Sequence, residues 1–128
     1  MTDIDSAADS LGAAGASPQV LAATPEEFDA LLASRNDILI VLYMWGPDCP
    51  NCEFFAKRMP ALLDQLKGAR VVLVKVDVYA RPELARRYGV FGIPHFLLFR
   101  AGKRLGKMSE FRGDAYWLGV IRDNLPVG

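Results

Sequence analysis

Cysteine, histidine and long apolar runs are scarce in this sequence of 128 residues. It has only two cysteines, which excludes a small secreted domain held together by several disulfides. The longest apolar run covers eight residues, 38–45, whereas a membrane-spanning helix needs about 20. Fifteen basic residues balance fifteen acidic ones, so bulk charge favours neither nucleic acid nor a membrane surface as a partner.

The remaining composition is that of one folded domain, because 52% of the residues are hydrophobic. Residues 1–17 are rich in Ala, Ser, Gly and Asp and contain no basic residue. This composition predicts a disordered N-terminal tail, followed by a folded domain over residues 18–128. No Lys or Arg precedes Arg35, unlike the positively charged start of a secretory signal. We therefore expect a soluble, cytoplasmic protein.

Apolar and turn-forming residues predict strands alternating with helices. The run 38–45 is apolar throughout, which is typical of a central strand covered on both faces. Thr24, with Pro25 next and Glu27 three residues on, predicts the start of a helix. The expected order is strand 18–21, a helix from Thr24, strand 38–45, a helix after Cys49, strand 71–78, helix 81–88, strands 94–100 and 103–111, and helix 114–125. This order predicts an α/β protein with a central mixed sheet and helices on both faces.

The chemistry of the chain is concentrated in Cys49-Pro50-Asn51-Cys52, between a buried strand and a helix. Pro50 fits the first helical position, which makes Cys49 the N-cap. Unpaired backbone N–H groups at a helix start favour a thiolate, and cysteines so placed have pKa values of about 3.5–7.5 rather than about 8.5. A thiolate attacks a disulfide to form a mixed disulfide, and a second thiol one helical turn further on, here Cys52, can resolve it.

A CxxC pair has two other possible uses. A zinc site needs about four ligands, and His95 is the only histidine, so a site within one chain is disfavoured while a site shared by two chains stays open. An inert structural disulfide is also disfavoured, because such a pair need not lie at a strand-to-helix turn. We favour a redox pair, which carries electrons itself and requires neither a metal nor another cofactor.

Four segments, taken together in this order, resemble the thioredoxin family. They are Trp45–Cys52 (WGPDCPNC), Val76–Val78 (VDV), Tyr88–Pro94 (YGVFGIP) and Phe99–Lys103 (FRAGK). The resemblance covers about residues 18–125 and implies the thioredoxin fold and dithiol–disulfide exchange on protein substrates. It also implies a cis Ile93–Pro94 bond beside the cysteines. Gly92, Ile93 and Pro94 would then bind an extended substrate segment through main-chain hydrogen bonds.

The sequence departs from the family pattern at three places around the cysteines. Pro-Asn replaces the usual Gly-Pro between them, and the other two departures concern the acidity of the cysteines. Asp48 occupies the position of a usual Trp, where its carboxylate would raise the pKa of Cys49 unless it is an ordinary helix-start residue. Tyr43 occupies the position of the buried Asp that accepts the proton of the resolving thiol. A phenol is a poor base near neutral pH, so the proton of Cys52 needs another route.

Two further residues are candidates for tuning the pair. Lys75 matches the buried lysine of the family and either pairs with Asp77 or the backbone, or extends to water from the edge of its strand. His95 replaces a usual Thr after Pro94. It would act as a base or, when protonated, favour the thiolate; the alternative is a hydrogen-bonded strand residue without a role in chemistry.

The main hypothesis is a cytoplasmic thiol–disulfide oxidoreductase that reduces protein disulfides, with Cys49 as nucleophile and Cys52 as resolving thiol. A thioredoxin-reductase-like enzyme or a small thiol would recycle the pair. A second hypothesis is a binding or assembly module with vestigial redox activity, motivated by Tyr43. A third, an oxidase or isomerase in an oxidising compartment, is disfavoured because no secretory signal is found. We expect neither nucleic acid nor a membrane as a partner.

Overall fold

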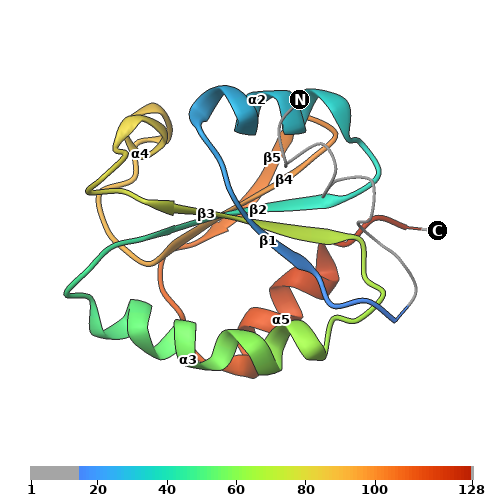
Figure 1. The fold of residues 1–128 in the computed structure, drawn as a ribbon. Helices are drawn as coiled ribbons and strands as arrows, with labels where there is room; N and C mark the ends of the chain where they lie inside the picture. Colours follow the sequence, from blue (N-terminus) through green and yellow to red (C-terminus); the bar gives the residue numbers. More distant parts are fainter. Residues whose placement is uncertain (1–14, 128) are drawn as a thin grey trace.

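A computed structural model describes residues 15–127 and has the predicted α/β architecture around a five-stranded sheet (Figure 1). The strands are β1 (Gln19–Ala22), β2 (Leu39–Trp45), β3 (Val71–Asp77), β4 (His95–Arg100) and β5 (Lys103–Met108). Their order across the sheet is β1-β3-β2-β4-β5. The first three are parallel, whereas β4 and β5 run antiparallel to their neighbours, so the sheet is mixed as predicted.

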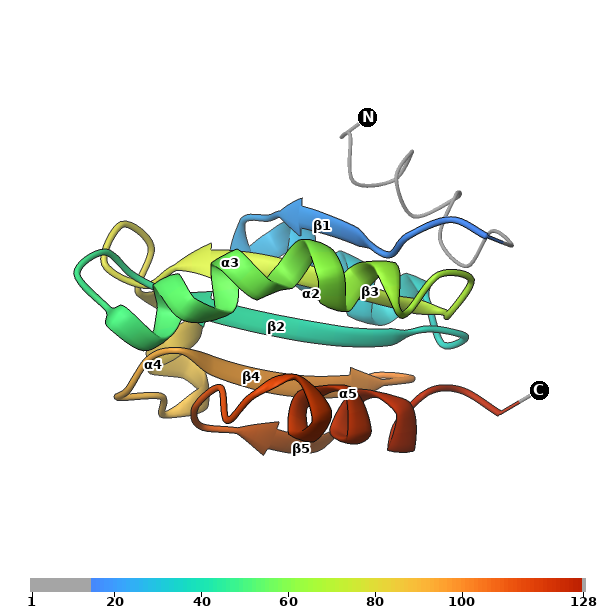
Figure 2. The ribbon, with the colours of Figure 1, turned by 90° about the horizontal axis from the view of Figure 1, so that it is seen from below.

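Helices cover both faces of this sheet. They are α2 (Pro25–Ser34), α3 (Pro50–Asp64), α4 (Glu83–Tyr88) and α5 (Asp114–Asp123). Helices α2 and α4 lie on one face, and α3 and α5 lie on the other (Figure 1). The view from below shows α3 over β2 and β3, with α5 over β4 and β5 (Figure 2).

Strand β2 is the centre of the core, as its unbroken apolar sequence predicted. Its residues from Leu39 to Met44 are at most 1% exposed. Alternate side chains enter two separate apolar clusters, since successive residues of a strand point to opposite faces. The cluster under α2 and α4 receives Ile40, Leu42 and Met44, and the cluster under α3 and α5 receives Leu39, Val41 and Tyr43.

Local signals in the sequence explain where several elements begin and end. Thr24 Oγ1 accepts a hydrogen bond from the Glu27 N–H at 3.2 Å, and Glu27 Oε1 accepts one from the Thr24 N–H at 2.9 Å, which completes the capping box of α2. Helix α4 ends at Gly89, whose φ of 66° is left-handed. Ala101 and Gly102, with φ of 52° and 76°, form the tight turn between β4 and β5.

Strand β5 ends at Met108, three residues before the predicted end at Phe111. The reason is that the backbone of Phe111 pairs with the side chain of Asn51 and not with β4. Within the predicted tail, the Ala16 carbonyl accepts a hydrogen bond from the Gly68 N–H at 2.8 Å. The predicted disorder of residues 1–14 lies outside the described residues.

Candidate functional site

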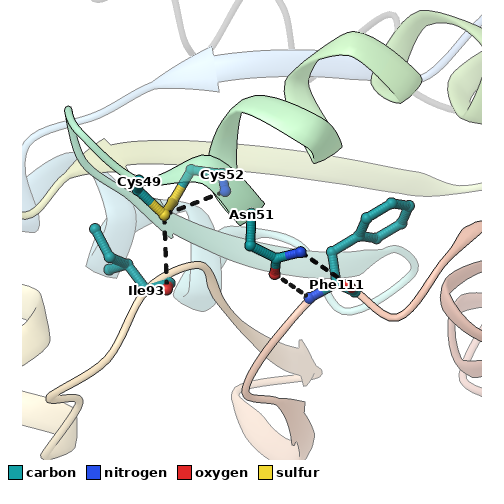
Figure 3. Close-up of a disulfide and its surroundings, with 5 residues drawn as sticks. All are labelled: Cys49, Asn51, Cys52, Ile93 and Phe111. Atoms are coloured by element: carbon teal, nitrogen blue, oxygen red, sulfur yellow. Dashed lines mark hydrogen bonds between the residues drawn. A yellow bond between two sulfur atoms is a disulfide. The ribbon is translucent and has the colours of Figure 1, made fainter.

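The two cysteines lie where β2 leaves the sheet and α3 begins. Cys49 is the N-cap of α3 and Pro50 is its first residue, as the sequence predicted. The Cys52 N–H donates a hydrogen bond to Cys49 Sγ, with a nitrogen–sulfur distance of 3.1 Å (Figure 3). The sulfur therefore occupies the position in which a helix N-terminus stabilises negative charge.

Cys49 and Cys52 form a disulfide in the structure, with their Cα atoms 5.2 Å apart (Figure 3). Cys49 is 8% exposed and Cys52 only 3% exposed. The sulfur of the N-cap residue is thus the more accessible of the pair. A nucleophile arriving from solvent would meet Cys49 first, while Cys52 is shielded by the body of the protein.

The predicted substrate-binding segment lies beside this disulfide. The Ile93–Pro94 peptide bond is cis, as the resemblance implied. The Ile93 carbonyl oxygen is 3.7 Å from Cys49 Sγ (Figure 3). Gly92 is exposed, Ile93 is half-buried and Pro94 is buried. The structure therefore brings Ile93 and its neighbours together with Cys49, although these residues are more than forty positions apart in the sequence.

Tyr43 belongs to the cluster under α3, on the cysteine side of the sheet. Its ring contacts Phe55 of α3 with a centroid separation of 4.9 Å and stacks on Phe96 of β4 at 5.2 Å. Burial raises the pKa of the Tyr43 phenol to about 12. The phenol therefore stays protonated at neutral pH and cannot accept the proton of Cys52.

Lys75 is neither paired with Asp77 nor at an edge of the sheet. It lies on β3, which pairs with both β1 and β2, and its side chain is half-buried. The Lys75 Nζ atom is 4.7 Å from the ring centroid of Trp45. The Asp77 carboxylate instead accepts hydrogen bonds from the N–H groups of Tyr79 and Ala80. Lys75 and Trp45 also line an open cavity of about 480 Å³ beside the carboxyl ends of β1, β2 and β3.

His95 begins β4 and is paired with Met44 near the end of β2. Alternation along β4 places it on the same face as Leu97 and Phe99, under α2 and α4, and therefore opposite to α3. It is 8% exposed, and its Nε2 atom has no hydrogen-bond partner within residues 15–127. Burial, with a smaller effect from Lys107 and Arg104, lowers the pKa of His95, so the neutral imidazole is favoured.

Asp48 lies one residue before the N-cap of α3. Its side chain is exposed, and its backbone adopts a left-handed conformation with φ of 55°. The predicted effect of its carboxylate on the acidity of Cys49 stays a prediction.

Among residues 15–127, no group of three or more His, Cys, Asp and Glu side chains is arranged to hold a metal ion. No helix in this range combines the length and apolar character required to cross a membrane.

Comparison with known proteins identifies the family. A family model described as Thioredoxin matches residues 19–118. The chain belongs to the thioredoxin family. Over 102 residues it is 29% identical to human Glutaredoxin-3, covering 76% of this chain and 30% of that protein. Over 93 residues it is 37% identical to Protein disulfide-isomerase A3 of Gallus gallus, covering 73% of this chain and 18% of that protein.

This thioredoxin-family chain thus spans less than a third of the length of these two relatives. In contrast, it aligns with nearly the whole chain of a solved thioredoxin from Fasciola hepatica, with a TM-score of 0.70 and 27% sequence identity. The alignment covers 82% of this chain and 97% of that one. Family membership and the Cys49–Cys52 pair together support thiol–disulfide oxidoreductase chemistry in general.

One residue of this thioredoxin-family site was not predicted to have a role. The Asn51 side chain, between the two cysteines, forms two hydrogen bonds with the backbone of Phe111. Sequence reasoning had no signal for this contact, because the partner lies sixty positions away and takes part through its main chain. Any residue other than proline could supply the same backbone groups at that position.

Proposed function

We propose that this protein reduces disulfide bonds in other proteins, with Cys49 as nucleophile and Cys52 as resolving thiol. The observation that carries the proposal is the position of Cys49 Sγ at the start of α3, where it accepts a hydrogen bond from the Cys52 N–H. The same contact would stabilise a thiolate in the reduced protein, because a charged acceptor strengthens a hydrogen bond.

The proposed reaction transfers two electrons from the pair to the substrate. The Cys49 thiolate attacks one sulfur of the substrate disulfide, which forms a mixed disulfide and releases the other substrate sulfur as a thiolate that takes up a proton. Cys52 then loses its proton and attacks Cys49 Sγ. This step forms the Cys49–Cys52 disulfide and releases the second substrate thiolate. The structure has the disulfide that this step would produce.

Exposed aromatic side chains around the pair support a protein as the substrate. Phe91, immediately before Gly92, is 100% exposed, and Phe54, two residues after Cys52, is 50% exposed. Tyr79 is 69% exposed and its ring lies against Gly46, in the loop that leads to the cysteines. Apolar groups in these positions would contact the side chains of a bound polypeptide, while the Ile93 backbone would pair with its main chain.

A recycling partner is part of the proposal, since each turnover leaves the pair oxidised. A thioredoxin-reductase-like enzyme or a small thiol would return two electrons to the disulfide. The cytoplasmic location stays a prediction, consistent with a chain whose two cysteines both belong to this pair.

The test is the reduction of insulin by dithiothreitol, followed as turbidity. The native protein should accelerate it, and Cys49→Ser should abolish the acceleration. Cys52→Ser should accumulate a mixed disulfide with insulin, detected by mass spectrometry. An acceleration that survives in Cys49→Ser would exclude the proposed reaction.

A binding or assembly module is the second candidate, favoured by the neutral Tyr43 phenol in place of a base. Its redox pair would exchange slowly with glutathione buffers. Partner binding that persists in a Cys49→Ser/Cys52→Ser double variant, together with an inert native pair, would favour the module over the reductase.

A further inference from the structure

The side chain of Asn51 pairs with the backbone of Phe111 as a strand residue would. The Asn51 Nδ2–H group donates to the Phe111 carbonyl oxygen at 3.1 Å, and the Phe111 N–H donates to Asn51 Oδ1 at 2.9 Å (Figure 3). This two-bond ring joins the first turn of α3 to the connection between β5 and α5, residues 109–113.

Two ring contacts and one ion pair add to this connection along one face of α3. The Phe111 ring is 5.3 Å from Phe54 and 5.1 Å from Phe55, measured between ring centroids, and Phe111 is only 4% exposed. One turn further on, Arg58 Nη2 is 2.6 Å from an Asp114 carboxylate oxygen. Residues three, four and seven positions after Asn51 share its face of the helix. The ring contacts and the ion pair hold the body of α3, and Asn51 is the contact nearest to the sulfur atoms.

The hydrogen bond to Cys49 Sγ depends on the geometry of this first turn. In the oxidised protein the disulfide itself ties Cys49 to Cys52. Reduction removes that covalent link, and the first turn of a helix has the fewest internal hydrogen bonds to hold it. The Asn51–Phe111 ring contains no sulfur atom, so nothing in the reduction step breaks it.

We propose that Asn51 is a positioning residue for the Cys49 thiolate. By holding the first turn of α3 to Phe111, it keeps the Cys52 N–H directed at Cys49 Sγ after the disulfide is reduced. The thiolate is thereby stabilised in the dithiol state, in which it is needed for attack. This inference rests on the proposed redox function, because it concerns how the reduced pair is prepared for exchange.

The test compares Asn51→Ala with Arg58→Met as a matched control. Both variants lose a polar contact of α3: Asn51 contacts the connection before α5, and Arg58 contacts the first residue of α5. Arg58 lies two helical turns from Asn51. The rate of iodoacetamide alkylation at Cys49, located by peptide mass, is measured against pH in the reduced proteins. At pH values below the midpoint of the alkylation curve, the fraction of Cys49 present as thiolate should be about three- to tenfold lower in Asn51→Ala than in the native protein. Arg58→Met should keep the native midpoint.

The glutathione equilibrium is a second readout, which a purely structural role would not move. Loss of thiolate stabilisation in Asn51→Ala should shift the equilibrium toward the disulfide by the same factor, and tenfold corresponds to about 30 mV. A change in thermal stability alone, with native alkylation and equilibrium curves in both variants, would overturn the proposal. A native protein that does not exchange with glutathione at all would instead overturn the proposed function.

A measurement on the native protein keeps the proposal testable if Asn51→Ala does not fold. Hydrogen exchange of the Phe111 amide is followed by NMR in the disulfide and dithiol states. Protection that persists after reduction supports the proposal, because the Asn51 Oδ1 acceptor is then still in place. Protection of the Phe111 amide that is lost on reduction, while the amides of α3 stay protected, would overturn it.

Discussion

The rings of Tyr43 and Phe96 stack on neighbouring strands, with centroids 5.2 Å apart and planes inclined by 11°. Phe55 of α3 meets both rings edge-on, at 4.9 Å in each case. The face of the sheet under the first turns of α3 is therefore aromatic and uncharged. Tyr43 stands there at the position that matches the buried Asp of the family.

Tyr43→Phe should leave the pH dependence of insulin reduction unchanged. The phenol has its pKa raised to about 12, and its hydroxyl takes no part in proton transfer near neutral pH. Stability should fall by less than about 1 kcal/mol, because the ring packing is kept. Tyr43→Ala, which removes the ring, should cost about 3–5 kcal/mol in urea unfolding. A displaced pH profile in Tyr43→Phe would show that the phenol does exchange protons during turnover.

His95 should make the folded protein less stable as the pH falls below neutral. Its pKa is lowered from 6.5, first by burial and then by Lys107 and Arg104, so the unfolded chain binds more protons in this range. The stability conferred by the neutral imidazole is complete above the unfolded pKa and is lost as the pH falls from about 6.5 through the folded pKa.

Urea unfolding at a series of pH values from about 8 to about 5 measures this slope. His95→Leu should flatten it, because the group that titrates is removed. Lys107→Gln should flatten it in part, since it removes one of the two positive charges that oppose protonation of His95. An unchanged slope in His95→Leu would assign the pH dependence to other groups.

The elements of the fold were predictable because their signals are local. An unbroken apolar strand, a capping box and a Pro after the N-cap each act within a few residues, and β2, α2 and α3 start as predicted to within one residue. The proximity of Ile93 to Cys49 came from the family resemblance. No local pattern joins segments that far apart.

The surroundings of two site residues could not be predicted from the sequence, because they depend on which face of the sheet a side chain occupies and which distant group it contacts. His95 was expected to act on the cysteines as a base or as a positive charge. It is at their end of the sheet, but strand alternation places it on the opposite face from α3. Lys75 was expected to pair with Asp77 or the backbone, or to extend to water; it is not paired with Asp77, and its ammonium group lies over the Trp45 ring. Both outcomes follow from strand register, which is fixed by the packing of the whole sheet.

Gly46→Ala should lower both the rate of turnover and the stability of the protein. A Cβ at position 46 would lie 2.5 Å from the Tyr79 ring and 2.8 Å from Ile93 Cδ1. Both are side chains that can move outward, so the cost in urea unfolding should be about 1–3 kcal/mol. The displacement of Ile93, whose carbonyl is beside Cys49 Sγ, should slow insulin reduction several-fold. Gly106→Ala is the matched control, because a Cβ there meets nothing within 4 Å. Equal rates in the two variants would contradict this prediction.

Lys75→Met should weaken the protein by removing the contact between an ammonium group and an indole ring. The Lys75 Nζ atom lies 4.7 Å from the Trp45 ring centroid, and an interaction of this kind at a partly exposed site contributes about 0.5–1 kcal/mol. Methionine keeps most of the aliphatic stem, so the loss reports chiefly on the charge. A double-mutant cycle with Trp45→Leu isolates the pair and should give a coupling energy of that same size. A coupling energy near zero would mean that the ammonium group is stabilised by water rather than by the ring.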